Sequence, residues 1–237
     1  MHLHRIHLNP RCKEARRDLA DPYQMHATLC RAFFSPETAC PQGALLWRQE
    51  PETDRYGRAR VLIQSRAAPD WTRVPADWLA PALSVTDMPV SPGIDLVQKL
   101  ALDALQIGQA FRFRLRANPS KTVQGKRQGV VHPDAQREWL ASKGEQHGFA
   151  LPESATTDYF EFMQSPEGRA YPDFRVSLEQ LLKGNQHDGN AIRVYSALFE
   201  GRLTVADPAR FRVALKTGIG HGKVMGLGLL SVVPVVG

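Results

Sequence analysis

The sequence has few cysteines and no long apolar run, and each shortage argues against a class of protein. Only three cysteines occur in 237 residues, Cys12, Cys30 and Cys40, and no two of them have Cys-x-x-Cys spacing. An odd number of scattered thiols argues against a secreted domain built on disulfides. No stretch approaches the roughly 18–20 apolar residues of a membrane span. Residues 1–13 lack the apolar core of a signal peptide. We therefore expect a cytoplasmic protein with no membrane partner.

Motifs for metals and nucleotide cofactors are also missing. The sequence has no His-Glu-x-x-His motif, no Cys/His cluster at ligand spacing and no acidic metal pair. The stretch KTGIGHGKVMGLGLL at 216–230 is rich in glycine, but it does not fit G-x-G-x-x-G. The sixth position is Lys223 when counted from Gly218, and Met225 when counted from Gly220. We expect neither a metal nor a cofactor.

Acidic residues are missing from one long segment. Residues 108–131 carry six basic side chains and no acid, within a chain of net charge +6 in which 22 of the 30 basic residues are arginine. The guanidinium group suits phosphates and base edges, and phosphate neutralisation depends on local charge. The segment therefore favours a nucleic-acid partner, with an ordinary solvated surface as the alternative. Residues 151–168 show the opposite bias, with four acids and no base.

Apolar periodicity and turn residues predict an α+β protein made of tandem ferredoxin-like (RRM-like) βαββαβ domains, at residues 1–100 and 101–237. Asp21-Pro22 and Asp207-Pro208 predict two helix starts. The expected strands are 2–8, 44–49, 58–66, 111–117, 191–199, 203–205 and 227–236, and the expected helices are 21–34, 134–143 and 207–218, with a helical turn near 75–79. Strands 191–199 and 203–205 would form a hairpin.

The strand expected at 111–117 separates two kinds of side chain. Its apolar residues occupy the odd positions and its arginines the even ones, so we predict a half-buried strand with an open basic face. The candidate contacts to a phosphate backbone are Arg112, Arg114, Arg116, Lys121, Lys126 and Arg127, together with Lys216 and Lys223 on either side of the first glycines.

The glycines of 218–228 also have a structural interpretation. Gly218 would end the preceding helix and begin a turn into the last strand. Gly226 and Gly228, placed on one face of that strand, indicate close approach of another backbone or of a ligand.

The segment GIGHGKVMGLG at 218–228 resembles the C-terminal glycine-rich loop of the RAMP superfamily of CRISPR-associated RNA-binding proteins; its defining positions are Gly218, Gly220, Gly226 and Gly228, with Lys223 between them. Other stretches narrow the likeness to the CasE family, the crRNA-processing endoribonucleases of type I-E CRISPR systems. These are DPYQMH at 21–26, FRLRANPSKT at 113–122, FEGRLTVADP at 199–208 and GLGLLSVVP at 226–234.

This resemblance implies a metal-independent endoribonuclease that binds a CRISPR repeat stem-loop, cleaves precursor crRNA and stays with the product beside the other Cascade subunits. Cleavage would proceed by attack of the 2′-hydroxyl on the scissile phosphate. The alternative is a non-catalytic RNA-binding subunit of the same superfamily.

The resemblance places catalysis at Tyr23 and His26, which lie on one helix surface because they are three residues apart. Histidine titrates near neutral pH and suits proton transfer. Tyrosine, with an ordinary pKa of about 10, would orient the phosphate or donate a proton. Without the resemblance, simple packing and capping of the helix would be the better interpretation of the pair.

Overall fold

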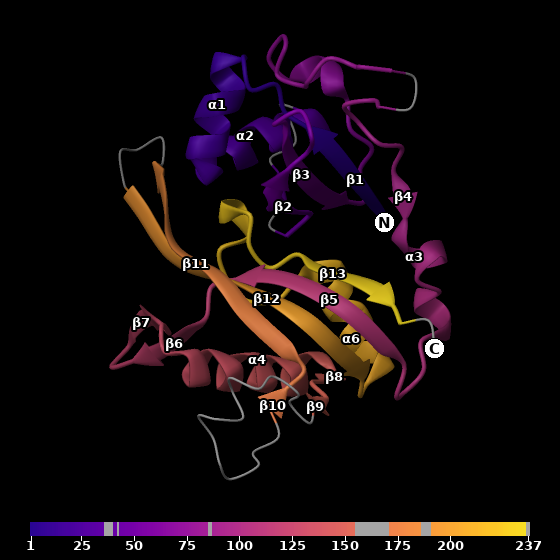
Figure 1. Ribbon diagram of the computed structural model, residues 1–237, viewed down its shortest axis with the longest axis vertical. Helices are drawn as coiled ribbons and strands as arrows, with labels where there is room; N and C mark the ends of the chain where they lie inside the picture. The colour runs from indigo at the N-terminus through magenta and orange to yellow at the C-terminus, as the bar shows by residue number, and fades with distance from the viewer. Residues whose placement is uncertain (36–39, 42, 85–86, 155–170, 186–190, 236–237) are drawn as a thin grey trace.

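The computed structural model describes residues 1–237 except 36–39, 42, 85–86, 155–170, 186–190 and 236–237 (Figure 1). Most of the acidic segment at 151–168 therefore lies outside the described residues. None of the described helices is long and apolar enough to cross a membrane.

The N-terminal sheet has the strand order of a ferredoxin-like unit. Its strands are β1 (His2–His7), β2 (Leu45–Thr53), β3 (Ala59–Ser65) and β4 (Ile94–Asp95), in the order β2-β3-β1-β4 with antiparallel pairing. Helices α1 (Lys13–Ala20) and α2 (Pro22–Phe33) follow β1. The second helix of the motif is reduced to the 3₁₀ turn η1 (Trp71–Arg73), so the helical turn expected near 75–79 is misplaced.

Helix α2 begins as predicted. The carboxylate of Asp21 accepts hydrogen bonds from the backbone N–H groups of Tyr23 and Gln24 at 2.9 and 3.4 Å, which caps the free N–H groups of the first turn. The stripe of Met25, Leu29 and Phe33 is buried in the core of this unit. Burial of that stripe fixes which face of α2 remains available to solvent.

The C-terminal sheet repeats the same order. Its strands are β5 (Ala110–Ala117), β11 (Phe174–Asn185), β12 (Ala191–Val205) and β13 (Leu230–Pro234), in the order β11-β12-β5-β13, and again the pairs are antiparallel. Helices α4 (Pro133–His147) and α6 (Pro208–Thr217) lie along one face of it (Figure 1). Its apolar cluster includes Phe111, Phe199 and Phe211.

The remaining elements connect or extend the two sheets. The connection between the sheets contains α3 (Leu96–Lys99) and the 3₁₀ turn η2 (Leu102–Ala104). The division at residues 100 and 101 stays a prediction. Short pieces surround the second sheet: β6 (Ser120–Val123), β7 (Lys126–Gly129), β8 (Phe149–Ala150), β9 (Glu153–Ser154), β10 (Tyr171–Pro172) and the 3₁₀ turn η3 (Lys223–Met225).

Two local predictions for the C-terminal sheet are wrong. The expected hairpin around Glu200-Gly201 is one continuous strand, β12, and its hairpin partner is β11. Gly201 sits within that strand because a Cβ there would lie 2.2 Å from the carbonyl oxygen of Asp173. The last strand begins at Leu230, so Gly226 and Gly228 precede it.

Candidate functional site

Tyr23 and His26 are half-buried on the first two turns of α2, beside the end of β11. The backbone N–H of Asn185 donates to the Asp21 carboxylate at 3.2 Å, which ties that end of β11 to the start of the helix. A Cβ on Gly184 would lie 3.1 Å from the Cβ of Tyr23 and 3.0 Å from Met225. Tyr23 therefore borders the place where α2, β11 and the glycine-rich loop meet.

The imidazole of His26 faces a pair of thiols. Its Nε2 lies 3.4 Å from Sγ of Cys30, and its Nδ1 is enclosed with no hydrogen-bond partner among the described residues. The ligand atoms of His26, Cys30 and Cys40 all lie within 4.8 Å of one another. The sequence showed no Cys/His cluster, but the fold makes one: His26 and Cys30 are one helical turn apart, and Cys40, ten residues after Cys30 in the chain, lies beside them.

The two thiols are not equivalent. A hydrogen bond from Cys30 lowers the pKa of Cys40 to about 5. Burial raises this pKa, and His26 lowers it further. The same hydrogen bond raises the pKa of Cys30, and burial raises it by a smaller amount. One sulfur of the pair therefore carries thiolate character next to the imidazole.

A cleft of about 470 Å³ lies between the two sheets, and we call it the Arg116 cleft. Its lining includes Pro22, Trp47, Lys183 and Met225 besides Arg116. The Nε and Nη2 atoms of Arg116 are buried and have no hydrogen-bond partner in the part of the chain that is described. Burial and the nearby Arg48 lower the pKa of this guanidinium. A guanidinium with two buried nitrogens that lack partners, placed in a polar cleft, is suited to an anion.

The neighbouring Arg114 is fully engaged. It forms ion pairs with Glu50, with Glu52 at 3.4 Å and with Glu200 at 2.6 Å. The expected open basic face of β5 is therefore wrong at this position, because β2 of the other sheet brings carboxylates onto it. Arg112, at the outer end of β5, remains exposed and lines a separate cleft with Arg175 and Arg202.

The buried partner of this network is Arg48 on β2, with a side chain only 1% exposed. Its guanidinium donates to Glu50 at 2.7 Å and to the hydroxyl of Ser231 at 3.1 Å. It also donates to the backbone carbonyls of Arg114 and Leu229 at 3.1 and 3.0 Å. One side chain of the N-terminal sheet thus binds two strands of the C-terminal sheet.

A second basic area gathers around the glycine-rich loop. Lys121, Lys126 and Arg127 are exposed on the β6–β7 hairpin, which projects from the body of the molecule (Figure 1). Burial lowers the pKa of His221, and so do the charges of Arg127, Lys143 and Lys223. Arg127, Lys143 and Lys223 thus all lie close enough to His221 to affect its pKa. Lys143 was not among the contacts expected from the sequence. Its sequence signal was weak: it follows Trp139 by four residues, and its ammonium group lies over the ring of Trp139.

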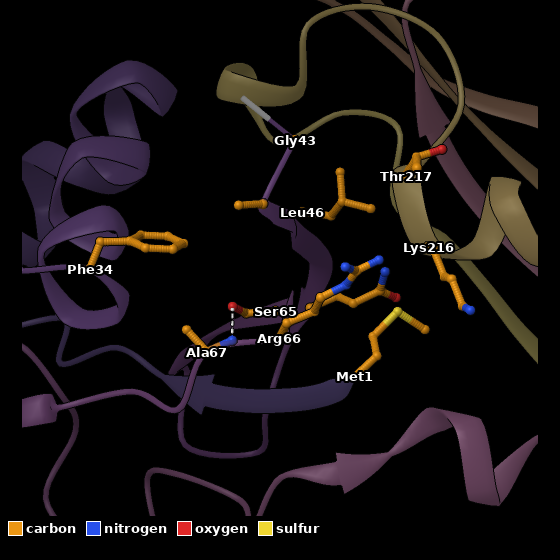
Figure 2. A pocket seen from close by; sticks show the side chains of 11 residues that line it. Met1, Phe34, Gly43, Leu46, Ser65, Arg66, Ala67, Lys216 and Thr217 are labelled. Carbon is orange, nitrogen blue, oxygen red and sulfur yellow. Dashed lines mark hydrogen bonds between the residues drawn. The ribbon is translucent and has the colours of Figure 1, made fainter. Parts of the chain in front are cut away.

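Lys216 belongs to a different place. It lines a pocket of about 460 Å³ with Arg66, Phe34, Leu46 and Thr217 (Figure 2). The two lysines that flank the first glycines in sequence are thus separated in space: Lys216 faces the edge of the N-terminal sheet, and Lys223 faces the hairpin side.

The glycines of the loop permit close backbone packing. Gly218 has a φ of 74°, and a Cβ there would lie 2.7 Å from the carbonyl oxygen of Gly228. A Cβ on Gly226 would lie 2.8 Å from the ring of Trp47 on β2. The N–H of Gly228 donates to the carbonyl of Arg116 at 2.7 Å, so the loop supports the backbone of the cleft arginine. Gly220, also at positive φ, lies beside the ring of Trp139.

Two ferredoxin-like units with a buried arginine in the cleft between them, and a helix beside that cleft that carries a tyrosine and a histidine, define a class of protein suited to RNA. Comparison with known proteins gives the family. Residues 1–234 match the family model described as CRISPR associated protein. The chain is 37% identical over 238 residues to the CRISPR-associated endoribonuclease Cse3 of Thermus thermophilus, covering 99% of this chain and 100% of the relative.

A second relative is the CRISPR system Cascade subunit CasE of Escherichia coli K12, 33% identical over 219 residues, with 90% of this chain and 99% of the relative covered. A solved structure of Cse3 bound to a 19-nucleotide RNA superposes with a TM-score of 0.76 at 35% identity, over 99% of this chain and 100% of that one. The chain therefore belongs to the family of CRISPR-associated endoribonucleases that includes Cse3 and CasE. The expected α+β fold of tandem ferredoxin-like units is confirmed.

Proposed function

We propose that this protein binds the stem-loop of a CRISPR repeat RNA, cuts the precursor crRNA without a metal ion, and stays with the product in a Cascade complex. The support is the full-length likeness to Cse3, which has been solved bound to an RNA that represents a pre-cleavage complex, and the likeness to a Cascade subunit. The alternative, an RNA-binding subunit without activity, would keep the basic surfaces but not need the Tyr23–His26 pair.

The observation that carries the proposal is the unpartnered guanidinium of Arg116 in a cleft bordered by the start of α2. Pro22 and Met225 line this cleft, and Tyr23 lies next to Met225 across Gly184. A phosphate bound to Arg116 would satisfy the two buried nitrogens and would lie near the exposed side of α2. Arg116 would then stabilise negative charge as it develops on that phosphate.

The chemistry assigned to α2 is proton transfer. His26 would take the proton from the 2′-hydroxyl or give one to the departing 5′-oxygen, and attack on the adjacent phosphate would leave a 2′,3′-cyclic phosphate. Tyr23 would orient the phosphate. Since Nε2 of His26 faces Cys30 in the free protein, RNA binding must turn the ring; catalytic hydrogen bonds commonly tighten only in the complex.

The exposed basic side chains would hold the stem by its backbone. Double-stranded RNA is recognised mostly through shape and phosphate contacts, which suits Lys121, Lys126 and Arg127 on the hairpin and Lys223 beside the glycine-rich loop. Arg112 and Lys216 line two other surfaces and stay candidate contacts. The carboxylates around Arg114 make that residue a structural one.

Cleavage of end-labelled cognate repeat RNA in excess EDTA tests the proposal. We expect wild-type protein to cut once per repeat in EDTA, and His26→Ala to bind the hairpin with similar affinity but to cut at least about 100-fold more slowly, the usual range for a proton-transfer group. Binding by wild type without any cutting would establish the non-catalytic alternative. Loss of cutting in EDTA would refute the metal-independent mechanism.

A further inference from the structure

His26, Cys30 and Cys40 form a cluster whose two thiols are not needed for the proposed cleavage reaction. Neither thiol has a role in proton transfer to RNA, and the third cysteine, Cys12, lies apart and contacts Glu14. Both Cys30 and Cys40 are free and partly exposed. Within the described residues, these three side chains are the only group of histidine, cysteine or acidic residues close enough to share an ion.

The spacing of the three ligand atoms is that of a tetrahedral site. Bond lengths of about 2.3 Å to sulfur and about 2.0–2.1 Å to nitrogen put neighbouring ligands roughly 3.5–3.8 Å apart. The 3.4 Å between Nε2 of His26 and Sγ of Cys30 already matches that separation, and every pair lies within 4.8 Å. To reach tetrahedral spacing, no pair of ligand atoms has to approach by more than about 1 Å.

The donor set also selects the ion. Two thiolates and one imidazole are typical of zinc, and three protein ligands leave a fourth position for water. Magnesium and calcium ions prefer oxygen ligands, so neither ion would compete with zinc for this site. On binding, a sulfur that still holds a proton would release it to solvent as that sulfur becomes a ligand.

We propose that His26, Cys30 and Cys40 form a zinc site that, when filled, withdraws His26 from catalysis. Metal on Nε2 removes the lone pair that would accept a proton and holds the ring on the thiol side. The binding site itself stands on the cluster geometry alone. Its inhibitory effect rests on the proposed role of His26 in RNA cleavage. The site would make the nuclease sensitive to free zinc while its own chemistry needs no metal.

Titration of the full-length, metal-free protein with Co²⁺ in a thiol-free reductant tests the site directly. We expect one equivalent of Co²⁺ to give thiolate-to-cobalt charge-transfer absorption and the intense visible bands of a tetrahedral ion, and Zn²⁺ to displace both. Cys30→Ser and Cys40→Ser should each weaken binding by more than the roughly 10–100-fold that loss of an outer-shell partner costs. Cys12→Ser is the matched control and should bind as wild type does.

Three results of this titration would overturn the site: no thiolate-to-cobalt absorption, an unchanged spectrum in Cys40→Ser, or loss of the signal in Cys12→Ser alone. Circular dichroism of each variant shows whether the fold is kept. If Cys30→Ser fails to fold, Cys40→Ser and His26→Ala, whose side chains lie at the edge of the core, still decide the question.

RNA cleavage then tests the inhibitory effect. Stoichiometric Zn²⁺ should stop wild-type cutting, a chelator should restore it, and Cys40→Ser should need at least tenfold more Zn²⁺ for the same inhibition relative to its own zinc-free rate. Equal inhibition of both proteins would refute the inhibitory role. A protein that binds Co²⁺ as expected but never cuts RNA would refute the proposed function and leave the metal site standing.

Discussion

Arg114 and Arg116 lie two residues apart on one face of β5, yet their surroundings differ. Arg114 is held by three carboxylates, and its neighbour Arg48 donates to Glu50, two carbonyls and a hydroxyl. Arg116 keeps two buried nitrogens without a partner in the described structure. Arg114 and Arg48 therefore join the two sheets, whereas Arg116 can still donate hydrogen bonds to a ligand.

The difference shows why a count of basic residues does not locate a binding surface. A buried guanidinium nitrogen without a hydrogen bond destabilises the fold, and the proposed phosphate would supply the missing bonds of Arg116. A guanidinium surrounded by carboxylates has no attraction left for phosphate. The partners that decide this, Glu50 and Glu200, are 64 and 86 residues away from Arg114 in the chain.

Removal of Arg48 should have the largest effect. Arg48→Met leaves the carboxylate of Glu50 buried with one cation fewer and frees two carbonyls, so we expect the free energy of unfolding to fall by about 3–5 kcal/mol. Urea denaturation followed by circular dichroism measures it. The double variant Arg48→Met/Glu50→Gln should lose less than the sum of the single variants. Strict additivity would show that the two side chains do not act as a pair.

Arg116→Gln should show the opposite profile. Stability should stay the same or rise, because an unpartnered buried charge is removed. The affinity for repeat RNA should fall by about 1.5–3 kcal/mol, the value of a hydrogen bond to a charged group. Filter binding at fixed salt, together with urea denaturation, separates the two quantities.

Arg114→Gln is the matched control, since it has the same substitution on the same face of the same strand. It should lose stability and keep most of its intrinsic RNA affinity. If Arg114→Gln weakened RNA binding as much as Arg116→Gln does, the division between a structural and a binding arginine would be wrong.

The parts that sequence predicted well depend on local signals. Asp21-Pro22 marked the start of α2, whose apolar residues Met25, Leu29 and Phe33 recur at helical spacing and are buried. The parts that failed depend on partners distant in the chain. Gly201 looked like a turn because nothing local shows that β11 passes within contact of it. The cluster of His26 with Cys40 joins residues 14 positions apart in the chain, and their spacing does not encode that contact.

The smallest expected effect separates the two lysines that looked equivalent in sequence. Lys223→Ala should weaken RNA binding modestly and make the slope of log affinity against log salt shallower by about 0.7–0.9, the loss of one phosphate contact. Lys216→Ala changes the same residue type seven positions earlier, in the pocket with Arg66. If the stem lies on the β6–β7 hairpin side, only Lys223→Ala changes the slope. A change confined to Lys216→Ala would instead place the RNA along the edge of the N-terminal sheet, and it would separate the bound stem from Arg127 and Lys143.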